Sequence, residues 1–114
     1  MFAGLGTGDG VVRYTVDTKE HDGWYYYKTL WAIAPSYTGK VVITGEHIGG
    51  SNELRFNSGT GFPGQKKREL RFPADSAGRW RYGPSATLIK APGCYAFRVQ
   101  GDDLDQNIAF RATG

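Results

Sequence analysis

The chain has 114 residues and a net charge of +3, a length that fits one domain and can bury a core without disulfides or a metal. Glycine takes 17 positions and aromatic residues make up 14% of the chain, whereas Met occurs once. This composition excludes a coiled coil, a disulfide scaffold and a fully disordered chain, and it favours an all-β domain.

Residues 1–10 hold four glycines and predict a flexible lead-in to a single domain over 11–114. The lead-in has no cationic segment and no apolar run, so it is not a signal peptide. No stretch approaches the ~20 apolar residues of a membrane helix, so no membrane span is predicted. Localisation stays open between an extracellular or envelope setting, if a signal was removed, and the cytoplasm.

From residue 11 onward, apolar and polar residues alternate in short runs that are separated by turn signals. Asp22-Gly23 predicts a hairpin, and residues 58–67 and 73–85 are predicted to be long loops. No stretch places apolar residues at helical spacing. Eight short strands are predicted, over residues 11–16, 24–34, 40–48, 53–57, 68–72, 86–90, 94–100 and 107–112.

Seven to eight short strands in one domain predict an antiparallel β-sandwich with Greek-key connections, and a small closed barrel is the alternative. The apolar side of each strand predicts the core. The side chains expected to be largely buried are Trp31, Leu54, Phe56, Leu70, Phe72, Tyr95, Phe97, Val99, Ile108 and Phe110.

The run PGCYAFRV at residues 92–99 resembles the penultimate strand of many immunoglobulin-like domains, in which the tyrosine hydroxyl ties back to the preceding corner. The longer run over residues 84–101 resembles a segment of uncharacterised bacterial proteins, mostly exported ones, and residues 23–31 fit the same group loosely. This resemblance implies an immunoglobulin-like sandwich and an envelope setting, and it carries no activity.

Few residues suit catalysis, and the chain is predicted not to be an enzyme. His21, His47 and Cys94 are expected to lie apart, the histidines as ordinary side chains and the cysteine as a small packed one. A trio of Ser51, His47 and Asp22 has no local support, and no Gly-x-Ser-x-Gly motif occurs. The alternative of a small hydrolase therefore has almost no support.

No metal or cofactor is predicted. Asp103, Asp105 and Asn107 have the one-three-five spacing of a calcium loop, but the sixth position is Ile108 instead of glycine. Whether the carboxylates of Asp102, Asp103 and Asp105 hold a calcium ion stays open. The single cysteine excludes an internal disulfide and cysteine-rich zinc sites.

Two aromatic segments and one basic segment are the candidate binding sites. Residues 79–82 alternate arginines with rings, which stack on sugars or bases, and six basic residues fall within 66–81. Residues 24–27 put rings on both faces of one strand, which is either buried on both sides or open on one. The candidate ligand-binding residues are Trp80, Tyr82, Arg79, Arg81, Lys66, Lys67, Trp24 and Tyr26.

These observations predict a non-catalytic binding or adhesion module of a bacterial envelope, with an unknown protein or glycan as its ligand. A homo-oligomer through an aromatic sheet face is a further candidate partnership. The alternative function is a polyanion or nucleic-acid binder that uses residues 66–81. Steep loss of binding with added salt would favour this alternative.

Overall fold

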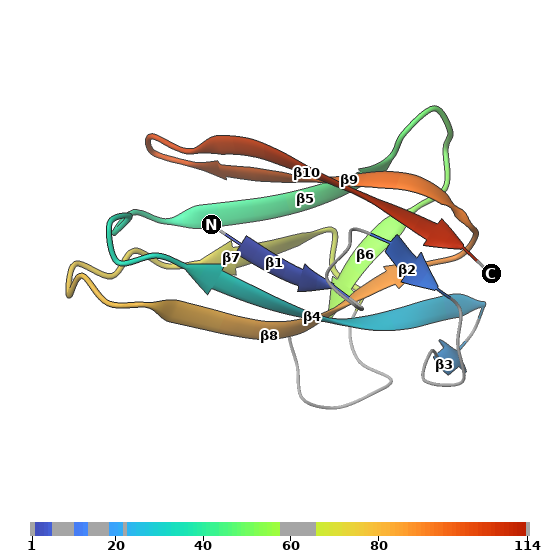
Figure 1. The fold of residues 1–114 in the computed structure, drawn as a ribbon, viewed down its shortest axis with the longest axis horizontal. Coiled ribbons are helices and arrows are strands. Elements are labelled where there is room, and N and C mark those ends of the chain that lie inside the picture. The colour runs from blue at the N-terminus through green and yellow to red at the C-terminus, as the bar shows by residue number, and fades with distance from the viewer. Residues whose placement is uncertain (1, 6–10, 14–18, 22, 58–65, 114) are drawn as a thin grey trace.

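Two β-sheets make up the part of the chain that the computed structural model describes, which is residues 2–5, 11–13, 19–21, 23–57 and 66–113 (Figure 1). Sheet I has the strand order β1 (Phe2–Leu5), β4 (Trp24–Ile33), β8 (Arg81–Ile89), β6 (Leu54–Asn57), and β3 (Lys19–His21) also pairs with β4. Sheet II has the order β2 (Val11–Arg13), β10 (Asp105–Thr113), β9 (Gly93–Gly101), β5 (Val41–His47), β7 (Glu69–Phe72).

The strand pairs are antiparallel except for β2 and β10, which run parallel. The described residues contain no helix, and their strands form two separate sheets instead of a closed barrel. The prediction of an all-β sandwich is therefore confirmed. None of the described residues belongs to a helix long and apolar enough to cross a membrane.

The eight predicted strands correspond to β2 and to β4 through β10, and the structure adds β1 and β3. Phe2–Leu5 lies in the predicted flexible lead-in but pairs with Thr29–Ala32 along the edge of β4. The remaining lead-in residues lie outside the described part of the chain. The predicted loop over 73–85 is wrong at its end, because β8 begins at Arg81 and continues through Gly83 and Pro84.

The core lies between the sheets, where the inward side chains of alternating residues meet. The Trp31 ring packs edge-on against Phe97, with 4.9 Å between centroids, and Phe97 stacks on Phe110 at the same distance. Eight of the ten predicted core residues are buried, whereas Phe72 and Ile108 are only partly buried. Phe72 ends β7, the outer strand of sheet II, so neighbours cover it incompletely.

The corner before β9 is closed by a tyrosine. Tyr95 is fully buried, and its hydroxyl donates a 2.7 Å hydrogen bond to the carbonyl oxygen of Ala91. Burial raises the pKa of Tyr95 above its usual value, since the charged phenolate is poorly solvated there. The predicted bond from this tyrosine to the preceding corner is confirmed.

Candidate functional site

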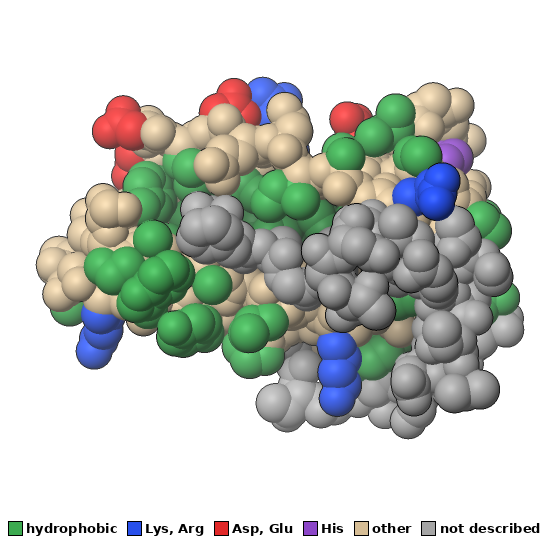
Figure 2. Space-filling view, viewed as in Figure 1, with side chains coloured by type: hydrophobic (Ala, Val, Ile, Leu, Met, Phe, Trp, Pro, Cys, Tyr) green, Lys and Arg blue, Asp and Glu red, His purple; other side chains and the backbone are tan. Residues whose placement is uncertain are grey.

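The outer face of sheet I carries an exposed apolar surface at the end where β4 finishes and β8 begins. Register places Leu30 opposite Pro84 and Ala32 opposite Tyr82, and these four side chains point away from the core. Trp80 precedes β8 on the same side. Figure 2 shows apolar side chains gathered at this end of the molecule. We call Leu30, Ala32, Trp80, Tyr82 and Pro84 the aromatic patch.

Two large rings dominate the aromatic patch. Trp80 is 46% exposed and Tyr82 is 62% exposed, and Leu30 beside them is 49% exposed. The two rings are stacked, with centroids 6.2 Å apart and planes 12° from parallel. Their spacing of two residues puts both on one side of an extended chain. The patch therefore presents two parallel rings to solvent.

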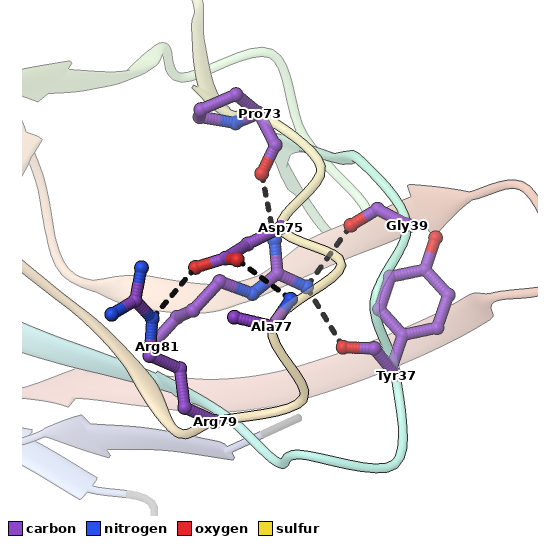
Figure 3. A network of polar contacts seen from close by, with 7 residues as sticks. All are labelled: Tyr37, Gly39, Pro73, Asp75, Ala77, Arg79 and Arg81. Atoms are coloured by element: carbon purple, nitrogen blue, oxygen red, sulfur yellow. Dashed lines mark hydrogen bonds and ion pairs between the residues drawn. The ribbon is translucent and has the colours of Figure 1, made fainter.

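Arg81 lies between these rings in sequence, but its side chain points to the opposite side and holds two loops together (Figure 3). One terminal nitrogen donates a 2.7 Å bond to the carbonyl of Pro73. The other donates to the carbonyls of Tyr37 at 2.9 Å and Gly39 at 3.0 Å. Because three charge-assisted bonds converge on one guanidinium, the loop over 34–40 is joined firmly to the loop over 73–80.

The loop that leads to Trp80 is also braced from within. Asp75 accepts a 3.0 Å hydrogen bond from the Ala77 N–H and a 3.0 Å bond from Arg79 Nε (Figure 3). The N–H of Asp75 donates a 2.9 Å bond to the Thr38 carbonyl. The bond from Ala77, followed by the bond from Arg79, lowers the pKa of Asp75 below its usual value. Gly78 turns the loop with a φ of +64°, which glycine adopts without strain.

The six predicted basic residues do not all gather in one patch. Lys67 pairs with Phe56 through two backbone bonds of 2.7 and 2.8 Å, and Phe56 lies opposite Thr87 in β8. Arg81 is six residues away along β8, about 20 Å at ~3.3 Å per residue. Arg79 is paired with Asp75, and Arg81 is bonded to backbone carbonyls. Both arginines beside the aromatic patch therefore have partners within the protein.

Trp24 and Tyr26 also lie far from the aromatic patch, although they occupy the same face of sheet I. Trp24 is at the opposite end of β4 and is only 6% exposed, since it packs with Tyr26, Ala86 and Leu88. The Lys90 ammonium lies 4.6 Å from the centre of its ring. Of the two alternatives for residues 24–27, the structure therefore has Trp24 covered, with Tyr26 partly buried.

Of the residues weighed for catalysis, His47 and Cys94 have side chains that the structure describes. His47 Nδ1 accepts a 3.2 Å bond from the Asn52 N–H, and its ring lies 4.9 Å from that of Tyr95. Cys94 is exposed, so the expectation of a packed cysteine is wrong. Tyr95 takes the inward position of β9, and its neighbour must point outward. The side chain of His21, together with Asp22, lies outside the described residues.

Metal-ligating side chains do not converge within the described ranges, where no group of three or more His, Cys, Asp or Glu residues is placed to hold a metal ion. The Asp102 N–H donates a 3.0 Å bond to the Tyr37 hydroxyl, and the Asp105 carboxylate lies 3.6 Å from Arg98. The Asp105 carboxylate and the backbone N–H of Asp102 therefore have partners within the protein.

No protein-family model matches the chain, and no curated protein matches it either. Among solved structures, the chain is similar to a family 123 glycoside hydrolase from Clostridium perfringens, with a TM-score of 0.40 and 15% sequence identity. The match covers 78% of this chain and 20% of that one, so the chain spans about a fifth of its length. A likeness of this size carries no argument about function.

Proposed function

We propose that the protein is a non-catalytic binding module that holds a saccharide on the aromatic patch. The proposal rests chiefly on two exposed, parallel rings, one on β8 and one on the loop before it that Arg81 and Asp75 fix in place. The apolar C–H faces of sugar rings pack against aromatic rings. A surface that is already ordered loses little conformational entropy when its ligand binds.

The size of the aromatic patch favours a small ligand over a protein. It comprises five side chains, whereas a stable protein interface uses roughly 20–30 residues on each side. A few sugar units would cover such a surface.

The module is further proposed to be immunoglobulin-like and to act in a bacterial envelope. Sheet I follows the order of the four-stranded sheet of an immunoglobulin domain, and β10, β9 and β5 follow the order of the other sheet. The bond from Tyr95 to Ala91 supports the same assignment. One departure is that β7 follows β6 in the chain yet extends sheet II beside β5. The envelope setting rests on the resemblance of residues 84–101.

A glycan array followed by calorimetric titration tests the proposed function. Trp80→Ala should weaken binding of the best array hit about tenfold or more, which corresponds to ~1.4 kcal/mol or more. Ile48→Ala is the matched control, because Ile48 is 48% exposed and lies outside the aromatic patch. Absence of any glycan hit, or equal losses in the two variants, would refute the proposal.

A further inference from the structure

A groove opens beside the aromatic patch because the two sheets end unevenly. β6 pairs only with Ala86–Ile89 of β8, so residues 81–85 have no described strand on that side. β7 is the outer strand of sheet II on the same side of the sandwich. Between them lies an open groove of about 910 Å³, lined by Lys67, Arg68, Glu69, Leu70, Arg71, Phe72, Gly83, Pro84 and Ser85.

The open edge of β8 is poorly suited to pair with another strand. The backbone N–H and C=O of Phe56 bond to Lys67, so they point away from β8. The neighbouring pair, Asn57 and Ala86, is therefore the one that exchanges hydrogen bonds between β6 and β8. Because backbone groups alternate in direction along a strand, those of Tyr82 and Pro84 point toward the β6 side as those of Ala86 do. Pro84 has no N–H, and Tyr82 is left as the one donor along this stretch. A groove ligand must therefore be held mainly by side chains.

An aromatic ring crosses the groove. The Phe72 ring from β7 lies against the backbone of Gly83 in β8, where a Cβ atom would collide with it. Glycine at this position thus lets the ring reach across the gap between the sheets. Ser85 follows along the same wall, and its hydroxyl lies 3.3 Å from the Thr29 carbonyl. The groove lining therefore combines the apolar side chains of Leu70, Phe72 and Pro84 with polar ones.

The charged groups of the groove are mostly positive. Lys67, Arg68 and Arg71 against Glu69 leave a net charge of +2 among its lining residues. Arg71 is ion-paired with Glu69 at 2.7 Å, and Arg68 is exposed. Cationic groups in a groove attract anions, and guanidinium groups bind carboxylate or sulfate oxygens through paired hydrogen bonds.

We infer that this groove holds the acidic group, a carboxylate or a sulfate, of a saccharide whose ring stacks on the aromatic patch. The inference rests on the proposed function and adds the chemical class of the ligand. Pro84 connects the two surfaces, since it lines the groove and also belongs to the aromatic patch two residues from Tyr82. One chain of sugars can therefore contact both, with rings on the patch and its anionic group near Arg68.

The experiment uses a glycan array that carries neutral, uronate-bearing and sulfated oligosaccharides, followed by titration of the best acidic hit. We expect acidic glycans to dominate the hits. Their affinity should fall about tenfold in Arg68→Gln/Arg71→Gln and should weaken further as salt rises from about 50 to about 300 mM. Arg98→Gln/Arg111→Gln is the matched control, since both side chains are exposed on sheet II and Arg98 is ion-paired with Asp105.

The outcomes separate the two proposals. Neutral hits that Trp80→Ala abolishes and Arg68→Gln/Arg71→Gln leaves unchanged would overturn the groove inference and keep the proposed function. Acidic hits that survive Trp80→Ala/Tyr82→Ala would overturn the aromatic patch as the binding surface, and the inference built on it. Equal competition by poly-glutamate would overturn the saccharide class, because an acidic peptide would then suffice. An equal loss of affinity in Arg98→Gln/Arg111→Gln would overturn the groove as the binding site, because the loss would then follow from the net charge of the protein.

Discussion

Trp24 and Trp80 lie at opposite ends of one face of sheet I, and their rings differ in how far neighbouring side chains cover them. At the first end, Trp24 is covered by Tyr26, Ala86 and Leu88 and has a lysine ammonium over its ring. At the second end, Trp80 stacks on Tyr82 and remains nearly half exposed. The difference teaches that an aromatic run becomes core or surface according to its cross-strand neighbours, which a local sequence pattern does not contain.

Stability should separate the two tryptophans most strongly. Trp24→Ala removes a buried ring and should lower the free energy of unfolding by about 3 kcal/mol or more. Trp80→Ala removes a ring that solvent already reaches, and its cost should stay below ~1 kcal/mol. Urea unfolding curves with unchanged slope measure both. Equal losses would mean that Trp80 is as much a part of the fold as Trp24.

At the Trp80 end of the sheet, stability should depend on the hydrogen bonds of Arg81 more than on the exposed rings. Arg81→Ala removes three charge-assisted hydrogen bonds to carbonyls and should cost roughly 2–3 kcal/mol. Arg79→Ala is the neighbouring control, because an exposed ion pair such as Arg79–Asp75 is worth ~0–1 kcal/mol.

Arg81→Lys should recover only part of the loss, because an ammonium lacks the planar fork that reaches three carbonyls. Saccharide binding should weaken in Arg81→Ala, since Trp80 and Tyr82 flank the lost bridge. Normal affinity in a destabilised Arg81→Ala would show that the rings need no bracing.

The smallest expected effect is the change in stability at low pH that depends on Asp75. Asp75 has an ordinary pKa of 3.8, and the bonds from Ala77 and Arg79 lower it in the folded state. Its contribution to stability is therefore complete above the ordinary pKa and is lost as pH falls through the folded pKa. The stability difference between wild type and Asp75→Asn should be present near pH 6 and shrink near pH 2. A difference that grows toward acid would contradict the assigned bonds.

Alternation and turn signals were sufficient to predict most of the sandwich. Residues such as Phe97 and Val99 repeat every second position, and this period alone places them inward. The start of β8 was missed because Gly83 and Pro84 ordinarily break strands. They are tolerated here since that stretch of β8 has no described neighbour on its outer side.

Only part of the aromatic patch could be predicted from the sequence. The exposed positions of Trp80 and Tyr82 agree with their prediction as candidate binding residues, which stays a prediction until a ligand is tested. Leu30 and Pro84 join them only through strand register. The role of Arg81 could not be predicted, because two of its three acceptors are backbone carbonyls of a loop 42 and 44 residues earlier in the chain.

The bridge from Arg81 to Tyr37 spans 44 residues of sequence, and this separation determines when the loop before β8 becomes ordered during folding. Contacts between such distant residues form slowly, after the chain between them has been organised. The loop that carries Trp80 is therefore held in place only once the loops over 34–40 and 73–80 have met. A bound ligand in turn selects the folded chain and stabilises it in proportion to the logarithm of ligand concentration. Binding of the proposed ligand to the patch would thus protect the sandwich from unfolding and from proteolysis.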